Sequence, residues 1–207
     1  MHPDYPYANA PRLPESEPLH LGELFGHTQP VDLELGPGRG GFIQERALQP
    51  GGPCIVGLEI RRKWATKVDE RLAALGLSSR ARVFAEDARL ILPRLASASI
   101  GAVFVHFPDP WWKKRHHKRL LLGPDVLAQL ARVVIPGGEL YIQTDVEERA
   151  EQYEAVVAGE PAFTAIEGGP RVAENPYGAY SPRERRSMAD EVPVFRLRYR
   201  RRDPVAV

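Results

Sequence analysis

The feature that most constrains the fold is a glycine-rich loop that directly follows a short run of β-forming residues. The run Val31–Leu35 leads into Gly-Pro-Gly-Arg-Gly-Gly at 36–41, and an apolar helical stretch starts at Phe42. In a doubly wound parallel sheet, such a loop joins a strand to a helix and lets a nucleotide-like ligand approach the backbone closely. The sequence therefore predicts an α/β protein whose ligand site lies at the C-terminal ends of its strands.

The rest of the chain alternates short β-rich runs with amphipathic stretches, the order that builds a parallel sheet with helices on both faces. We expect strands at Val31–Leu35, Cys54–Glu59, Ala81–Ala85, Ala102–Phe107 and Glu139–Thr144. Apolar spacings of three and four predict helices at Arg61–Leu75, Asp125–Val134 and Val146–Val157. A Pro-Gly-Gly turn at 136–138 is expected to stop the second helix. The alternating run Val192–Tyr199 should return to the sheet, giving a single Rossmann-like domain.

Length and composition limit what this domain can be. A chain of 207 residues, 43% of them hydrophobic, can fill one core but not two enzymatic domains, so we expect an N-terminal arm at 1–30 and one domain at 31–207. The net charge of +1 requires any nucleic-acid site to be a local patch. The single cysteine, Cys54, cannot form an internal disulfide and indicates a cytoplasmic location. No apolar run approaches the roughly 18 residues of a membrane span, so no membrane partner is expected.

The glycine loop and nearby acids indicate the ligand. The spacing of Gly36, Gly38 and Gly41 also fits the dinucleotide fingerprint, so a nicotinamide oxidoreductase stays an alternative. An acid just before the loop, Glu34, would repel a pyrophosphate but suits a ligand with an ammonium group, such as S-adenosylmethionine. Glu59 ends the next strand, where a carboxylate accepts hydrogen bonds from both ribose hydroxyls.

A third acid, Asp87, follows the third strand and is placed to meet the exocyclic amine of adenine. Each acid alone could be a solvated loop residue or a helix cap. Three acids at three successive strand ends, together with the loop, favour a bound methyl donor.

The fourth strand leads into Phe-Pro-Asp-Pro-Trp at 107–111, which presents Asp109 rigidly at the mouth of the same crevice. Trp111 or Trp112 offers a flat face for a base, and Asp109 can accept hydrogen bonds from a purine. Methylation of a ring nitrogen with a free lone pair requires no prior deprotonation, so Asp109 would orient and stabilise. The structural alternative is a turn whose tryptophans cover the core.

A cationic run follows at once, and its position next to the proposed base site favours phosphate binding over a merely solvated face. It consists of Lys113, Lys114, Arg115, His116, His117, Lys118 and Arg119. The two histidines have no cysteine or aspartate at a ligand spacing, so no metal is expected.

Three segments together carry a family resemblance: Glu-Leu-Gly-Pro-Gly-Arg-Gly at 34–40, Gly-Leu-Glu-Ile-Arg at 57–61 and the run from Phe107 to Arg119. On these motifs the chain resembles bacterial tRNA (guanine-N7-)-methyltransferases over roughly 30–200. The resemblance implies a class I methyltransferase fold with a mostly parallel seven-stranded sheet. It also implies S-adenosyl-L-methionine as the donor and the guanine at position 46 of the tRNA variable loop as the substrate.

The same resemblance implies residue roles. Asp109 would be catalytic, and the donor would be bound by Glu34, Gly36, Gly38, Gly40, Glu59, Asp87 and Asp109. The substrate would be contacted by Lys113, Asp145, Ser181 and Glu184. The RNA would be bound by Lys114, Arg115, His116, His117, Lys118 and Arg119.

Two positions leave the assignment open. Asp145 could instead cap the helix that starts at Val146. The Ser-Pro-Arg-Glu segment at 181–184 keeps the hydroxyl and the glutamate of the family's Thr-Lys/Arg-Phe-Glu but loses the aromatic and moves the basic residue. The remaining alternatives are another S-adenosylmethionine-dependent methyltransferase of RNA bases or amino groups and a non-catalytic RNA-binding module. The sequence leaves monomer and homodimer equally open.

Overall fold

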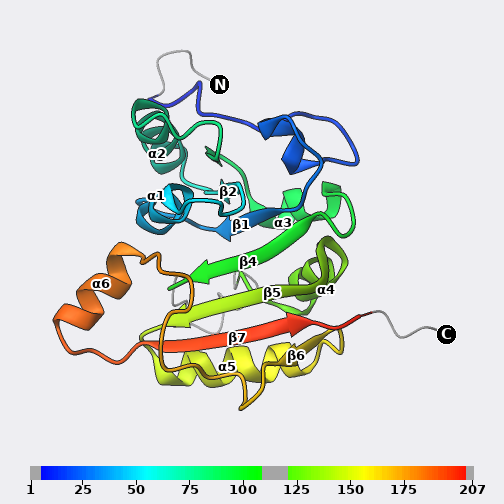
Figure 1. The fold of residues 1–207 in the computed structure, drawn as a ribbon, viewed down its shortest axis with the longest axis vertical. Coiled ribbons are helices and arrows are strands. Elements are labelled where there is room, and N and C mark those ends of the chain that lie inside the picture. Colours follow the sequence, from blue (N-terminus) through cyan, green and yellow to red (C-terminus); the bar gives the residue numbers. More distant parts are fainter. Residues whose placement is uncertain (1–5, 109–120, 204–207) are drawn as a thin grey trace.

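The computed structural model describes residues 6–108 and 121–203 of the chain (Figure 1). The described strands are β1 (Val31–Leu35), β2 (Ile55–Leu58), β3 (Ala81–Phe84), β4 (Ile100–His106), β5 (Val134–Thr144), β6 (Phe163–Ala165) and β7 (Phe195–Arg201). The described α-helices are α1 (Gly41–Leu48), α2 (Arg62–Ala74), α3 (Ala88–Ile91), α4 (Pro124–Val133), α5 (Glu147–Ala158) and α6 (Pro182–Ala189). Two short 3-10 helices are η1 (Leu21–Phe25) and η2 (Leu92–Arg94).

The strands of the described residues form one sheet in the order β3-β2-β1-β4-β5-β7-β6. Strands β1 to β5 pair in parallel, whereas β7 runs antiparallel to both β5 and β6. The order reverses between β1 and β4, and ligands bind in doubly wound sheets at such a switch point. The predicted mostly parallel seven-stranded sheet is confirmed, as is the return of the chain end to the sheet (Figure 1).

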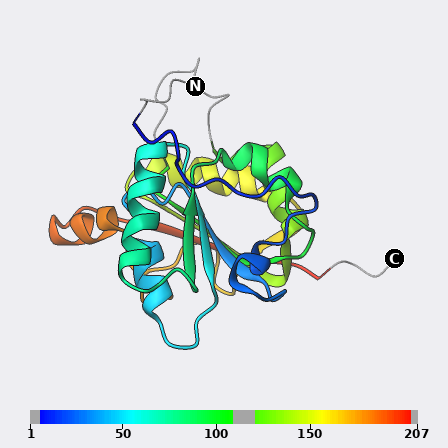
Figure 2. The same cartoon turned by 90° about the horizontal axis from the view of Figure 1, so that it is seen from above.

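Helices lie on both sides of the sheet (Figure 2). Because successive side chains of a strand point to opposite faces, β2, β3, β4 and β5 each contribute apolar residues to two layers. On β1, Leu33 packs in the layer that contains Ile91 of α3 and Leu127 of α4. The opposite layer includes Ile43 of α1 and Val68 of α2. Both buried layers hold the strand ends, and therefore the site, in a rigid frame.

Strand β5 differs from the prediction in its length. Its expected start was Glu139, but the strand begins at Val134, and α4 already ends at Val133. The Pro-Gly-Gly turn at 136–138 lies inside β5, where the register against β4 shifts between Ile100 and Ala102. The turn therefore forms an irregularity within the strand instead of ending the helix, and Gly137 adopts a positive φ of 76° there.

The described part of the N-terminal arm lies against the domain. Leu13, Leu19 and Leu21 are buried in the apolar layer of α3 and α4. Ala85 N donates to Pro11 O at 2.7 Å, and Ala96 N donates to Leu19 O at 3.0 Å. The arm thus follows the end of β3 and the loop before β4. Within the described residues, the helices are too short or too polar to cross a membrane.

Candidate active site at the strand ends

A cavity of about 570 Å³ lies at the C-terminal ends of the parallel strands. Its lining includes Gly36 after β1, Glu59 after β2, Asp87 after β3, His106 and Phe107 at the end of β4, and Tyr153 of α5. A cavity of this size is in the range that encloses a nucleoside-sized ligand. The structure therefore brings together the strand ends that the sequence predicts to form one crevice.

The glycine loop leaves its backbone open to this cavity. Gly36 has φ +74° and Gly38 has φ +56°, conformations that suit glycine, and a Cβ added to either would meet no atom of the described residues closer than 4.0 Å. Gly40 is different, because a Cβ there would lie 2.3 Å from the Cγ1 of Val68 in α2. The structure thus assigns to Gly40 the close approach of α2, whereas Gly36 is exposed and Gly38 is half-buried.

Glu59 is held by the loop that it faces. Its side chain is 3% exposed, and its Oε2 accepts a hydrogen bond from Gly38 N at 2.9 Å. Its Oε1 accepts from Arg61 N at 2.9 Å and from Arg61 Nε at 3.2 Å. Arg61 itself is 59% exposed in its side chain, so the Nε contact lies at the solvent side of the site. The carboxylate is fixed in orientation while one face can still accept a ligand hydroxyl.

Glu34 forms a buried pair that the sequence did not predict. Its Oε1 lies 2.8 Å from His106 Nδ1, and the side chains are 2% and 3% exposed. Both residues lie on the sheet face of Phe42, whose ring is 4.2 Å from the imidazole, centroid to centroid. Among the described residues, Glu34 Oε2 and His106 Nε2 are buried without a hydrogen-bond partner. Two polar atoms at the switch point are therefore free to accept or donate a bond to a ligand.

Asp87 combines a structural and a ligand-facing position. Its Oδ1 caps α3 by accepting from Arg89 N at 3.0 Å, and the Arg89 guanidinium pairs with both oxygens at 3.0 and 2.6 Å. The side-chain hydrogen bonds from Arg89 lower the pKa of Asp87 below its usual value. Asp87 is thus ionised at neutral pH and lines the cavity with a negative charge.

Asp145 lies at the end of β5 and is paired with α6. Arg183 donates from Nε to Oδ2 at 2.9 Å and from Nη2 to Oδ1 at 3.0 Å, a bidentate pair. The same guanidinium lies 5.4 Å from the ring centroid of Phe107. Thr144 Oγ1, not the Asp145 carboxylate, accepts from Val146 N at 3.2 Å. The structure therefore connects Asp145 with α6.

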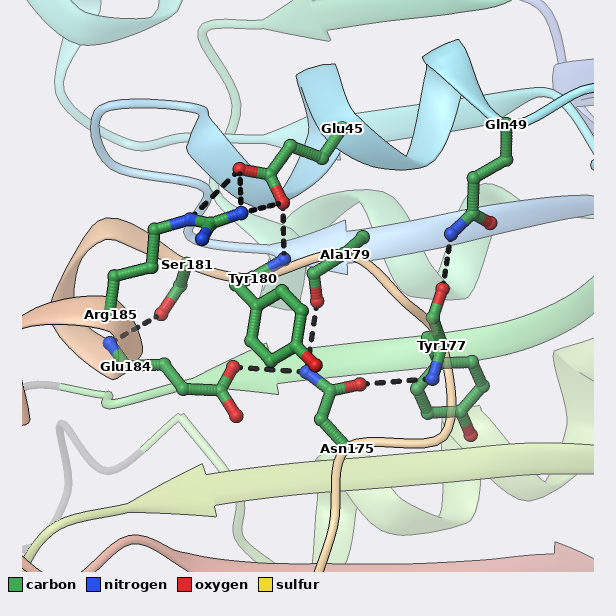
Figure 3. A network of polar contacts seen from close by, with 9 residues as sticks. All are labelled: Glu45, Gln49, Asn175, Tyr177, Ala179, Tyr180, Ser181, Glu184 and Arg185. Carbon is green, nitrogen blue, oxygen red and sulfur yellow. Dashed lines mark hydrogen bonds and ion pairs between the residues drawn. The ribbon is translucent and has the colours of Figure 1, made fainter. Parts of the chain in front are cut away.

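Ser181 and Glu184 begin α6 within a network of polar contacts (Figure 3). Ser181 Oγ accepts from Glu184 N at 3.1 Å and caps the helix. Glu184 is fully buried, and its carboxylate accepts from Asn175 Nδ2 at 3.0 Å and from Arg196 Nε at 3.0 Å. Both side chains are thereby engaged in holding the start of α6.

The network also ties this helix to the glycine loop. Arg185 forms a bidentate pair with Glu45 of α1, and Glu45 also accepts from Tyr180 N at 2.9 Å (Figure 3). A Cβ on Gly41 would lie 2.6 Å from Pro182 Cδ. The segment at 181–184 is therefore packed against the end of the glycine loop.

Several predicted residues lie outside the described residues: Asp109, Trp111, Trp112, Lys113, Lys114, Arg115, His116, His117, Lys118 and Arg119. Their predicted roles remain predictions. In residues 6–108 and 121–203, no group of three or more His, Cys, Asp or Glu side chains could hold a metal ion.

Sequence reasoning assigned no role in the site to His106, Phe107 or Tyr153, which line the cavity. A signal existed for His106, because it follows Phe104 on the same face of β4, but nothing in the sequence pairs it with Glu34. Tyr153 reaches the site from α5, which carries no motif. Arg183 lies in the segment at 181–184, whose role the sequence left open. Phe107 was expected to end a strand, whereas it lies beyond β4 with a positive φ of 47°.

Comparisons with known proteins agree with this geometry. The model of a family described as "Putative methyltransferase" matches residues 28–197. A tRNA (guanine-N(7)-)-methyltransferase of Anaeromyxobacter dehalogenans (strain 2CP-C) is 45% identical over 181 residues, which cover 86% of this chain and 87% of that protein. The protein of the same name from Myxococcus xanthus (strain DK1622) is 35% identical and covers 84% of each chain.

Solved structures show the same fold. The 16S rRNA methyltransferase KamB has a TM-score of 0.60 at 19% identity, over 85% of this chain and 90% of that one. A 16S rRNA (adenine(1408)-N(1))-methyltransferase from Catenulisporales acidiphilia has a TM-score of 0.60 at 17% identity, over 96% and 97%. These structural likenesses identify the architecture alone, whereas the sequence relatives extend over most of both chains. The chain therefore belongs to the tRNA (guanine-N(7)-)-methyltransferase family.

Proposed function

We propose that the chain transfers a methyl group from S-adenosyl-L-methionine to N7 of guanine in tRNA, at position 46 of the variable loop. The observation that carries this proposal is the acid-lined cavity beside an open glycine loop, at the switch point of the sheet. Relatives at 45% and 35% identity bear the name of this activity. The donor's sulfonium supplies an electrophilic methyl group when it is bound.

The described residues of the cavity fit such a donor. At Gly36 and Gly38, an added Cβ would meet no atom of residues 6–108 and 121–203 closer than 4.0 Å, so a ligand can approach the backbone there. Gly40 allows Val68 of α2 to pack closely against the loop. Glu59 has acceptor capacity for ribose hydroxyls, and Asp87 offers an ionised carboxylate on the third strand. Glu34 has a buried oxygen without a partner among the described residues, which suits an ammonium group. Asp109 completes the proposed donor site.

The proposed chemistry requires positioning more than proton transfer. The N7 atom of guanine has a free lone pair, so its attack on a methyl group needs no general base. Asp109 would orient the base and stabilise the positive charge that develops on it. Lys113, Asp145, Ser181 and Glu184 belong to the proposed substrate side, with Ser181 and Glu184 acting through the packing of α6 against the donor loop.

The RNA would be bound by the cationic run, which supplies charge for phosphates next to the base site. Its members are Lys114, Arg115, His116, His117, Lys118 and Arg119. We place the protein in the cytoplasm, because its single cysteine fits a reducing compartment. We expect it to act as a monomer or a homodimer.

The test is methylation of unmodified tRNA transcripts with a labelled donor, followed by digestion and separation of the nucleosides. We expect the label in N7-methylguanosine, and a transcript in which the guanine at position 46 is replaced by adenosine should take up none. Label in another nucleoside would contradict the proposed product. Label in N7-methylguanosine from the substituted transcript would contradict the proposed position alone.

A further inference from the structure

We propose that α2 and the glycine loop carry a second contact for the tRNA backbone, formed by Arg39, Lys63 and Lys67 and called here the α2 patch. This inference rests on the proposed function and extends the RNA-binding surface beyond the cationic run that follows β4 in the sequence. Lys63 and Lys67 lie on α2, and Arg39 lies in the glycine loop between Gly38 and Gly40. All three residues are exposed, so their charges are open to phosphates.

The first argument is that the cations of the α2 patch have no acidic partner. The structure pairs other arginines with carboxylates, as it does Arg82 with Asp69 and Arg185 with Glu45. Within residues 6–108 and 121–203, none of the three cations of the patch forms an ion pair. Because the net charge of the chain is only +1, cations that its own acids leave unpaired form a local positive patch and not a general field.

The second argument is the place of Lys63 on its helix. The amino end of a helix carries a partial positive charge, so acidic residues stabilise it and basic residues destabilise it. The first turn of α2 contains Lys63 and no acid, whereas Asp69 and Glu70 come in the second half of the helix. A local arrangement that lowers stability is expected where it serves a function. The lysine and the helix end together produce a positive potential that attracts phosphates.

The third argument is that the α2 patch is preformed. Arg39 Cζ lies 5.4 Å and Lys63 Nζ lies 5.8 Å from the ring centroid of Trp64, so this ring holds both cations beside it. The backbone of Arg39 is held as well, because its O accepts from Arg71 Nη2 at 2.6 Å. Lys67 follows Lys63 by four residues, which places both lysines on one face of α2. Cations that are already gathered lose less conformational freedom when they bind an RNA backbone.

The fourth argument is the position of the patch beside the donor cavity. Ile60 and Arg61 line that cavity, and α2 begins at the next residue. The predicted RNA-binding run follows β4 in the sequence, whereas α2 follows β2, and β1 separates these two strands in the sheet. Backbone contacts at both places would fix the register of the RNA over the cavity.

The distribution of lysine in the sequence supports the same assignment. The chain has five lysines, which are Lys63 and Lys67 of α2 and Lys113, Lys114 and Lys118 of the predicted RNA-binding run. Its remaining basic residues, apart from histidine, are arginines, whose planar fork suits fixed pairs with carboxylates, whereas lysine binds a phosphate as a point charge. Lysine thus occurs only in the two segments for which we propose RNA contacts.

The experiment measures binding of an unmodified tRNA transcript to the full chain by fluorescence anisotropy at several salt concentrations. A variant with Lys63→Gln and Lys67→Gln removes two charges from the α2 patch. Each phosphate contact adds about 0.7 to 0.9 to the steepness with which log K falls with log salt. The slope should therefore become less steep by about 1.4 to 1.8, and affinity at about 0.1 M salt should fall about 25-fold to 60-fold. A variant with Lys63→Arg and Lys67→Arg, which keeps both charges, should bind tRNA like the unaltered protein.

The matched control carries Arg200→Gln and Arg202→Gln, which also remove two charges. Arg200 lies opposite Glu139 near the end of β7, at the edge of the sheet away from the cavity, and Arg202 follows that strand (Figure 1). The tRNA affinity and the salt slope of this control should stay close to those of the unaltered protein.

Unchanged tRNA binding in the variant with Lys63→Gln and Lys67→Gln, or an equal loss in the control, would overturn the inference. The same variant should bind S-adenosylmethionine in calorimetry as the unaltered protein does, and a parallel loss of donor affinity would also contradict a contact made to RNA alone. Because tRNA binding is measured without turnover, a protein that binds tRNA through the α2 patch but methylates no guanine at N7 would contradict the proposed function alone.

Discussion

Glu59 offers the sharpest test of the donor site, through the substitution Glu59→Gln. A carboxylate has about four acceptor positions, and three are used here, by Gly38 N, Arg61 N and Arg61 Nε. The Nε contact is the longest at 3.2 Å and belongs to a side chain that is 59% exposed. When that arginine turns away, two positions become free, which matches the two hydroxyls of a ribose.

The size of the effect follows from this count. A glutamine has a single oxygen with two acceptor positions, and Gly38 N keeps one of them. One ribose hydroxyl then loses its acceptor, and the other exchanges a charged acceptor for a neutral one. Hydrogen bonds to charged groups contribute about 1.5 to 3 kcal/mol each. We therefore expect a loss of about 2 to 4 kcal/mol in donor binding, or about 30-fold to 800-fold.

The assay is isothermal titration calorimetry of S-adenosylmethionine with the purified variant. The matched control is Glu86→Gln, because Glu86 lines the same cavity but its oxygens are held by Leu13 N at 3.1 Å and Arg12 at 3.0 Å. Donor affinity of that control should stay within about threefold of the unaltered protein. Equal affinities of Glu59→Gln and the unaltered protein, or equal losses in both variants, would refute the reasoning.

Three further predictions concern stability and catalysis. Burial raises the pKa of Asp32 from 3.8 to about 6, so its favourable contribution is complete below pH 4 and lost as the pH rises through 6. Urea titrations should therefore show the unfolding free energy of the unaltered protein falling by about 3 kcal/mol relative to Asp32→Asn between pH 4 and 7; parallel curves would exclude this. Gly40→Ala should lower the melting temperature by several degrees more than Gly51→Ala, because both have a φ near +70° but only Gly40 abuts a valine of α2. Equal decreases of the melting temperature in the two variants would show that the structure relaxes around the added methyl group at position 40. Asp109→Ala should abolish methyl transfer while filter binding of tRNA is largely retained, and a parallel loss of RNA binding would contradict its orienting role.

The parts of the site that lie along one strand and its loop were predictable from the sequence. Hydrophobic periodicity located the strands, and a parallel sheet brings their C-terminal ends to one edge, so Glu34, Glu59 and Asp87 were expected together. The structure places Glu59 and Asp87 on the cavity and Glu34 just beside it. The position of each acid at the end of its own strand was sufficient for this prediction, because the parallel sheet itself brings the strand ends together.

Contacts between distant side chains were not predictable. The pair of Asp145 with Arg183 joins residues 38 positions apart, and that of Glu34 with His106 joins residues 72 apart. Neither follows from a periodicity or a spacing, because each depends on how α6 and β4 pack in three dimensions. Gly40 shows a related limit, since a packing glycine and a ligand-binding glycine look the same in a sequence.

The central claim is methyl transfer to N7, and the most direct measurement uses tRNA transcribed with 7-deazaguanosine in place of guanosine. That base keeps the N1–N2 edge and the ring but has a carbon where N7 accepts the methyl group. The protein should transfer label from S-adenosylmethionine to the guanosine transcript and none to the 7-deazaguanosine transcript, while binding both. Equal transfer to the two transcripts would show that another atom is methylated and would contradict the account.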